Sequence, residues 1–285
     1  FSFAKVPYGT WIIREIESPK GYVLSEEEIA VTIGKVDEVV EIELVNYFIK
    51  GNIALTKVDE DYPDNKLSGA VFEVYSDTNG DGKLDKDDTL LGEMKELDGG
   101  VYQMSELRYD KYLVKETKAP TGFVLDEDVY AVSIEENGKT YTVENKAGVG
   151  FINAAQKGSL KIVKTSSDGK VEGFSFRVTG VDYDQTFKTD KNGEIVIEGL
   201  RIGDYTVSEV SDKASAGYIL PADKQATVKV NATAIVQMHN EFRDTPKTGD
   251  DFNLGLWVSL AALSVVGAGV LGFVGYKNRK KKKED

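Results

Sequence analysis

The segment Tyr112-Leu-Val-Lys-Glu116-Thr-Lys-Ala-Pro120-Thr-Gly122-Phe123 joins an alternating strand pattern to a turn and carries an acid among its apolar positions. In a strand, residues two apart share a face, so Tyr112, Val114 and Glu116 point the same way. The proline and the glycine that follow are typical of a turn. The segment therefore predicts a β-strand that places a carboxyl group in a core, which is unfavourable unless the group is neutralised or paired.

This arrangement occurs three times along the 285 residues. Trp11 to Tyr22 repeats the spacing and places Glu15 on the apolar face of its strand. Tyr205 to Tyr218 forms a third copy around Glu209, although it lacks the proline and has two extra residues before its glycine. Three acids are therefore expected to point into a core.

Each acid is followed by an asparagine on an apolar strand face, and two units open with a lysine placed in the same way. The asparagines are Asn46, Asn153 and Asn240. The lysines are Lys57 and Lys164, and the residues two and four positions before each are apolar. The alternation predicts two buried sets of lysine, glutamate and asparagine, and one set without its lysine.

Burial favours the neutral forms of both ionisable groups, because it lowers the pKa of a lysine and raises that of a glutamate. A neutral lysine is a nucleophile. Held against the asparagine carboxamide, with a protonated glutamate donating to its oxygen, it would displace ammonia and join the first strand to the last. The alternative is a buried ion pair with asparagine as a hydrogen-bonding neighbour. Because lysine, glutamate and asparagine recur in the same order and on the same strand faces, we favour the amide-forming reaction over the ion pair.

Two neighbouring residues compete for these roles. Asn145 also has core parity and is an alternative to Asn153, but Asn46 and Asn153 each lie five residues before the glycine that opens the next unit. Lys161 has the opposite parity to Lys164 and is expected at the surface. Spacing and parity thus favour Asn153 and Lys164.

The quoted segment resembles the Y-x-L-x-E-T-x-A-P-x-G-Y segment of the Cna B-type or SpaA-like repeats of Gram-positive surface proteins and pilins. The resemblance covers nearly all of residues 1–243. It implies a sandwich domain in which lysine and asparagine form a spontaneous isopeptide bond assisted by glutamate. The implied pairs are Lys57 with Asn153, assisted by Glu116, and Lys164 with Asn240, assisted by Glu209.

Composition also favours the all-β class, because the apolar runs are short, alternate with polar residues, and are broken by glycine, asparagine and aspartate. We expect tandem immunoglobulin-like or prealbumin-like β-sandwich domains followed by a single C-terminal transmembrane helix. The expected divisions are residues 1–49, the C-terminal part of a truncated domain, then 50–155, 156–243 and a sorting signal at 244–285. Since cysteine is absent, disulfides cannot stabilise these domains.

The second unit contains an acidic insertion, residues 77–88, of sequence D-T-N-G-D-G-K-L-D-K-D-D. It matches a twelve-position calcium loop with oxygen donors at positions 1, 3 and 5, glycine at 6 and an acid at 12. Position 12 is not the usual glutamate and no helix is expected beside the loop, so an EF-hand proper is not expected. We predict a structural Ca²⁺, with an acidic, solvated hairpin tip as the alternative, and no cofactor for the chemistry. The candidate ligands are Asp77, Asn79, Asp81, Lys83, Asp85 and Asp88.

The C-terminus combines a short motif, an apolar span and a basic tail. The uncharged run from Leu254 to Tyr276 would reach roughly 34 Å as a helix, at about 1.5 Å per residue. The basic residues that follow, 277–283, are expected to stay in the cytoplasm. Such a span is long enough to cross a membrane.

The motif before that span is T-P-K-T-G at residues 245–249. With the span and the tail, it resembles a cell-wall sorting signal read by a sortase. The resemblance implies that Pro246 belongs to the recognised motif, that Thr248 is joined to the enzyme and that Gly249 begins the discarded piece. Thr245 stands where leucine is usual, which leaves the sortase class open. The alternative is a simple membrane anchor.

Charge and residue types exclude several classes. The chain has 48 acidic and 35 basic residues, a formal net charge of −13, which does not suggest nucleic-acid binding. The single histidine, His239, has the opposite parity to Asn240 and is expected to face outward. Without cysteine, the usual nucleophile and base pairs are missing. We expect no enzyme, only one self-directed reaction in each complete unit.

These features predict a secreted, wall-anchored adhesin stalk on the surface of a Gram-positive bacterium. The expected partners are a sortase, then peptidoglycan or a pilin, and a host or matrix ligand bound by a region before Phe1. The membrane is expected only as a transient anchor through the C-terminal signal. One alternative is a minor or backbone pilin subunit, for which Lys66 within Tyr62-Pro-Asp-Asn-Lys66 is a weak donor candidate. Another is the stalk of a surface enzyme whose catalytic domain lies upstream.

Overall fold

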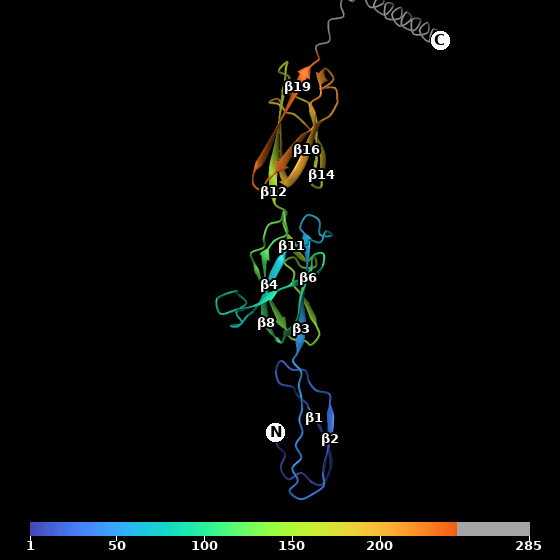
Figure 1. Ribbon diagram of the computed structural model, residues 1–285, viewed down its shortest axis with the longest axis vertical. Coiled ribbons are helices and arrows are strands. Elements are labelled where there is room, and N and C mark those ends of the chain that lie inside the picture. Colours follow the sequence, from blue (N-terminus) through green and yellow to red (C-terminus); the bar gives the residue numbers. More distant parts are fainter. Residues whose placement is uncertain (244–285) are drawn as a thin grey trace, which may run out of the picture.

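The computed structural model describes residues 1–243, which form a column of three units built from strands and loops (Figure 1). We call residues 1–49 the first unit, 50–155 the second unit and 156–243 the third unit. Within these 243 residues no helix has the length and apolarity needed to cross a membrane. The expected transmembrane helix and sorting motif lie outside the described residues.

The third unit consists of two four-stranded sheets. One has the order β15-β12-β19-β17, and the other β14-β13-β16-β18. The first and last strands, β12 and β19, run parallel side by side, and their neighbours in each sheet are antiparallel. The strands of the first sheet are β12 (Lys157–Ser166), β15 (Glu194–Arg201), β17 (Tyr218–Ile219) and β19 (Thr233–Phe242). Those of the second are β13 (Ser175–Gly180), β14 (Tyr183–Lys188), β16 (Gly203–Glu209) and β18 (Lys224–Val228).

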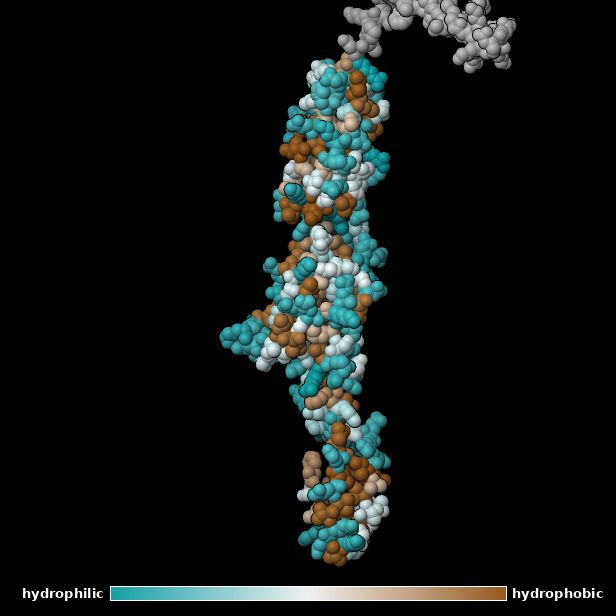
Figure 2. Space-filling view, in the orientation of Figure 1, coloured by the Kyte–Doolittle hydropathy of each residue, from teal (hydrophilic) through white to brown (hydrophobic). Residues whose placement is uncertain are grey.

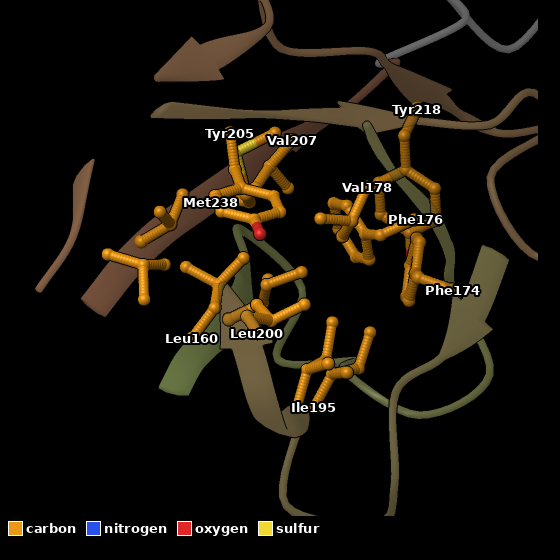
Figure 3. Close-up of a cluster of buried hydrophobic side chains, with 14 residues drawn as sticks. Leu160, Phe174, Phe176, Val178, Ile195, Leu200, Tyr205, Val207, Tyr218 and Met238 are labelled. Atoms are coloured by element: carbon orange, nitrogen blue, oxygen red, sulfur yellow. The ribbon is translucent and has the colours of Figure 1, made fainter. Parts of the chain in front are cut away.

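The core of the third unit lies between these sheets (Figure 3). Burial alternates along β12, as the sequence predicts, so that Leu160, Ile162 and Lys164 are inside while Lys161 is half-buried. Apolar side chains from both sheets meet there, because removing them from water is the main favourable contribution to folding. Among those labelled in Figure 3 are Leu160, Phe174, Phe176, Val178, Tyr205, Val207 and Met238.

The second unit repeats this plan with one difference in its last strand. Its sheets have the orders β10-β3-β7-β6 and β5-β4-β8-β9, and the three-residue β11 also pairs with β3. Both β10 and β11 run parallel to β3, so the last strand is split into two short pieces. The first sheet contains β3 (Lys50–Asp59), β6 (Lys95–Asp98), β7 (Val101–Arg108), β10 (Thr140–Thr142) and β11 (Phe151–Asn153). The second contains β4 (Val71–Ser76), β5 (Thr89–Glu93), β8 (Asp110–Lys118) and β9 (Val129–Ile134).

The first unit differs from its sequence-based expectation. It is a two-stranded antiparallel sheet of β1 (Gly9–Arg14) and β2 (Glu28–Ile33), and the strand expected to carry Asn46, at residues 42–46, is not formed. Glu15 and Asn46, expected in a core, are only half-buried. A two-stranded sheet has no facing layer to cover its apolar side. Figure 2 accordingly shows hydrophobic surface over this unit. The exposed apolar side chains of the unit include Ile12, Ile16, Val39, Ile42, Leu44 and Val45.

A charged clasp links the second unit to the third. Arg201, at the end of β15, donates from Nη1 to Asp59 Oδ2 at 2.6 Å and from Nη2 to Asp59 Oδ1 at 2.8 Å. Nη2 also lies 3.0 Å from Asp61 Oδ2. The side chains of Asp59 and Arg201 are only 3% and 14% exposed. The two-pronged contact fixes orientation as well as distance, which favours a stiff joint.

Replacing Arg201 with alanine is expected to destabilise this joint by about 3–5 kcal/mol, because Asp59 would remain buried without its cation. Denaturant unfolding of the purified chain measures the loss. Arg177→Ala is the matched control, since Arg177 makes the same two-pronged contact with Asp184 but both side chains are more than half exposed. That control should lose no more than about 1 kcal/mol. Equal losses in the two variants would contradict a special role for the clasp.

Candidate functional site

The second unit brings Lys57, Glu116 and Asn153 together in its core. Lys57 lies on β3, Asn153 ends β11 and Glu116 lies on β8 in the facing sheet. Asn153 pairs with Asp59, two residues after Lys57, so the lysine and the asparagine share the inner face of neighbouring parallel strands. Lys57 and Glu116 are fully buried, and Asn153 is 3% exposed.

The three polar groups of the second unit are in direct contact. Asn153 Nδ2 donates to Glu116 Oε1 at 3.0 Å and to Oε2 at 2.9 Å. Lys57 Nζ lies 3.8 Å from Glu116 Oε1 and donates to the backbone oxygen of Phe151 at 3.0 Å. The same nitrogen lies 4.9 Å from the centre of the Phe151 ring. Lysine and amide thus meet at one carboxyl group, away from water.

The third unit places Lys164, Glu209 and Asn240 on the corresponding strands β12, β16 and β19, with Lys164 and Asn240 buried and Glu209 half-buried. Asn240 pairs with Ser166, again two residues after the lysine, and Asn240 Nδ2 donates to Glu209 Oε1 at 2.7 Å. Lys164 Nζ donates to the backbone oxygen of Thr165 and lies 4.2 Å from the centre of the Phe174 ring. The register of lysine against asparagine is therefore identical in the two units.

The register of each glutamate is identical as well. Glu116 pairs with Phe72 across β8 and β4, and Glu209 pairs with Phe176 across β16 and β13. Both phenylalanines are fully buried. The acid therefore approaches lysine and asparagine from the opposite sheet and from the same position in both units.

Burial moves the ionisable groups of both centres toward their neutral forms. It lowers the pKa of Lys57 from 10.5 to about 8, although the nearby Glu116 carboxylate acts in the opposite direction. It raises the pKa of Glu116 against the hydrogen bonds from Asp126 and Asn153. In the third unit, burial likewise lowers the pKa of Lys164 and raises that of Glu209. A neutral amine beside a protonated acid is the pair that amide exchange requires.

The carboxamide oxygens of both centres lack a donor. Among buried side-chain atoms of the described residues, Asn153 Oδ1, Asn240 Oδ1 and Glu209 Oε2 have no hydrogen-bond partner. Buried acceptors are normally satisfied, so an unpaired one is unfavourable. A half-turn of the carboxamide would bring its oxygen to the glutamate, and a protonated carboxyl group would then donate to it. Such a bond would make the amide carbon more electrophilic.

The first unit holds the acid and the amide of a third set. Asn46 Nδ2 donates to Glu15 Oε1 at 2.8 Å and to Oε2 at 2.7 Å. This geometry matches that of Glu116 and Asn153 in the second unit. Since the set includes no lysine, the contact shows that glutamate and asparagine can adopt this arrangement without one.

A backbone donor to the glutamate was missed in the sequence. The N–H of Asp126 donates to Glu116 Oε2 at 2.8 Å, and the N–H of Ser25 donates to Glu15 Oε2 at 2.7 Å. Both donors lie ten residues after their glutamate, a spacing that repeats in the sequence and could have revealed them. The extra residues of the third unit break this spacing, and Glu209 Oε2 is left without a partner.

Asn145, the competitor of Asn153, has a different position. It donates to the backbone oxygen of Ile152 at 2.9 Å and accepts from the Ile152 N–H at 2.7 Å. It also donates to Asp126 Oδ2 at 2.7 Å, an oxygen that Tyr130 Oη contacts at 2.8 Å. Asn145 therefore holds the short strand β11 in place beside the centre.

The two residues expected at the surface are found there. Lys161 forms an ion pair with Glu194 at 2.7 Å, and its side chain is 30% exposed. His239 is half-exposed and contacts Thr165 Oγ1 at 2.8 Å. Neither residue approaches a buried centre, as the alternation of each strand predicts.

The aromatic residue that ends each copy of the motif is paired with a residue just after the asparagine of the same unit. The pairs are Tyr22 with Phe48, Phe123 with Ala155, and Tyr218 with Phe242. In every case the partner lies two residues after the asparagine. The third copy therefore makes the same contact despite its altered turn, and this contact helps to hold the asparagine in register.

The other predicted site residues lie elsewhere. Asp77 begins the loop after β4, at the opposite end of that strand from Phe72. In residues 1–243, three or more acidic or histidine side chains nowhere gather closely enough to hold a metal by themselves. Pro246, Thr248 and Gly249 of the sorting motif lie outside the described residues.

The fold and its two buried centres define a tandem β-sandwich protein whose units carry lysine, glutamate and asparagine in one core. A sequence model of the SpaA domain, described as a prealbumin-like fold domain, matches residues 1–47, 51–147 and 158–242. The chain belongs to this SpaA prealbumin-like domain family.

Comparison with solved structures shows similarity to the TIE protein of Bacillus anthracis, at 27% identity and a TM-score of 0.64 over 84% of this chain. The chain spans 42% of the length of that protein. Matches also include the streptococcal ancillary pilin, at 18% identity and a TM-score of 0.30 over 84% of this chain and 76% of the other. The minor pilin of Streptococcus agalactiae matches at 18% identity and a TM-score of 0.31, over 69% and 98% of the two chains. A search of curated protein sequences gave no match.

Proposed function

We propose that the chain is part of a surface stalk whose second and third units each form an internal Lys–Asn amide bond. The observation that carries this proposal is an arrangement found twice: a buried lysine and a buried asparagine lie in identical register on parallel strands, and the asparagine amide contacts a glutamate of the facing sheet. One such contact would also suit a structural ion pair. Two, each with an unpaired carboxamide oxygen, favour a reaction that uses both groups.

The proposed reaction is an amide exchange in which every atom is accounted for. The neutral Nζ of Lys57 attacks Cγ of Asn153, and Glu116 donates a proton to the carboxamide oxygen. Glu116 then carries a proton from the attacking nitrogen to the departing nitrogen and ammonia leaves, while the proton on the oxygen returns to Glu116 as the amide carbonyl re-forms. The folded unit supplies most of the rate, because it holds the amine against the amide. Lys164, Glu209 and Asn240 act in the same way in the third unit.

The position of these bonds supports a mechanical role. Each would join the first strand of a unit to its last strand, near the end where the chain passes to the next segment. Tension along the column would then pass through covalent bonds instead of separating hydrogen-bonded strands. With no cysteine in the sequence, these amides would supply the crosslinks that disulfides provide elsewhere.

Attachment to the cell wall is proposed from the sequence motif together with family membership. The T-P-K-T-G motif at 245–249, the apolar run and the basic tail are typical of a protein that is exported and then joined to peptidoglycan by a sortase. The same signal would serve a pilin subunit. In wall fractions of the producing cells, the chain should end at Thr248, and a chain that keeps Gly249 would oppose this part of the proposal.

Intact-mass spectrometry tests the crosslinks directly. The purified chain should be lighter than its sequence by the mass of two ammonia molecules, one for each complete unit. Peptide mapping should find Lys57 joined to Asn153 and Lys164 joined to Asn240. The full sequence mass would overturn the proposal. A deficit carried by other residue pairs would overturn the assignment.

A further inference from the structure

The loop between β4 and β5 stands apart from the rest of the second unit. It comprises residues 77–88 and extends sideways from the column, as the teal loop at the left of Figure 1. In Figure 2 the same projection is hydrophilic. Neither buried centre includes any of its residues, so the proposed crosslinks do not explain it.

Side chains at alternate positions fold back onto the loop's own backbone. Asp77 Oδ2 accepts from the N–H of Gly82 at 3.1 Å, and Asn79 Oδ1 accepts from the N–H of Asp81 at 2.9 Å. Asp81 Oδ1 accepts from the N–H of Lys83 at 2.8 Å. These three bonds turn the side chains at positions 1, 3 and 5 inward. Gly82 has a φ of +77°, which permits the tight turn between them.

Asp77 supplies a second observation, independent of the sequence pattern. It is only 4% exposed, and its Oδ1 has no hydrogen-bond partner although its Oδ2 is bound to Gly82 inside the loop. In residues 1–243, just four buried side-chain atoms are unpaired in this way, and the other three belong to the Lys–Glu–Asn centres. A buried carboxylate oxygen without a partner is strongly unfavourable. The missing partner is therefore a cation or a donor.

The positive charges near the loop do not provide that partner. Lys111 Nζ donates to the backbone oxygen of Gly80 at 2.9 Å, and Lys86 pairs with Asp87 at 2.8 Å on the outer side. Neither contacts Asp77, and the acids at loop positions 5, 9 and 12 are also without a lysine or arginine partner in the described structure. The inner charge of the loop is therefore not compensated by protein side chains.

We propose that this loop is a binding site for a calcium ion, built around Asp77 Oδ1. Ca²⁺ accepts six to eight oxygen ligands of mixed type, including carboxylates, amide and backbone carbonyls, and water. The loop offers the free oxygens of Asp77 and Asp81, the amide oxygen of Asn79 and the backbone oxygen of Lys83. A shell of this kind does not require three carboxylates to converge, which agrees with their separation here. Asp85 and Asp88 complete it through water.

Calorimetric titration of the purified, calcium-depleted chain with calcium chloride tests the site. We expect one ion per chain with a dissociation constant between about 0.1 µM and about 1 mM. Magnesium chloride should bind more weakly, because Mg²⁺ requires a smaller and more regular octahedral shell. Calcium should also raise the thermal unfolding temperature of the second unit, since an ion bound only by the folded loop stabilises it.

Three single substitutions make the test specific. Asp77→Asn and Asp81→Asn should each weaken calcium binding by at least about tenfold. Asp81 is exposed, so its replacement leaves the core intact even if the Asp77 variant folds poorly. Asp87→Asn is the matched control: it removes the same charge from the same loop at an exposed position that pairs with Lys86, and should bind like the parent.

Two results would overturn the proposal. One is the absence of binding by the parent chain at millimolar calcium. The other is an equal loss of affinity in Asp87→Asn and Asp81→Asn, which would indicate diffuse attraction to an acidic surface. Both results are independent of the mass measurement on the crosslinks, because the loop contributes no residue to either centre.

Discussion

Glu116→Gln is expected to abolish the crosslink of the second unit and leave that of the third unit intact. The intact mass should therefore rise, relative to the parent chain, by one ammonia molecule, beyond the small change due to the substitution. Glutamine keeps the volume of the side chain and its contact with Asn153, but it cannot carry a proton. A positioned acid or base typically contributes about 10²–10⁴ in rate, and without it the amine meets an unactivated amide.

The fold of the second unit must survive for this result to be informative. Glu116 is fully buried and interacts with Lys57, so circular dichroism should accompany the mass measurement. Glu127→Gln is a suitable control, because Glu127 lies exposed in the same unit, and its mass deficit should match that of the parent. A well-folded Glu116→Gln chain that still lacks two ammonia molecules would show that Glu116 is not required.

Lys57→Met is expected to produce the largest loss of stability, because it removes the nucleophile and thus the bond between β3 and β11. Such a bond closes a loop of roughly one hundred residues, for which chain entropy gives about 4–5 kcal/mol. Methionine fills the space of the lysine stem, and burial raises the pKa of Glu116, which favours a neutral carboxyl group that needs no cation beside it. A loss of stability is therefore attributable to the missing crosslink.

Denaturant unfolding and resistance to trypsin would measure the effect of Lys57→Met. Lys161→Met is the control, since Lys161 lies on the outer face of β12 and takes part in a partly exposed ion pair, which should contribute at most about 1 kcal/mol. The Lys57→Met chain should regain one ammonia in mass. Unchanged stability in a chain that has lost this crosslink would contradict the mechanical role.

Strand parity allowed the buried centres to be predicted from sequence. Alternation is a local property, so Lys57, Glu116 and Asn153 could be assigned to inner faces without knowing which strands are neighbours. The burial of all three confirms that inference. Whether these side chains contact one another depends on the register of the paired strands. The repeated motif indicated that register only indirectly.

Other features depend on contacts that no local pattern contains. The expected strand at 42–46 fails because alternation predicts which face is apolar but not whether a second layer covers it. Asn145 has core parity yet binds the backbone of Ile152, a role that parity cannot distinguish from that of Asn153. The clasp between Arg201 and Asp59 joins residues 142 positions apart, and nothing in the adjacent sequence of either residue identifies its partner.

The parallel pairing of first and last strands sets the spacing of the column. In the second and third units the chain enters along a ten-residue strand, β3 or β12, and leaves beside the far end of that strand. At about 3.3 Å per residue, each unit therefore advances the chain by roughly 33 Å, whatever lies between these strands. The second unit accommodates the additional β4–β5 loop without becoming a longer module. The length of the column then grows with the number of units, while insertions diversify their flanks.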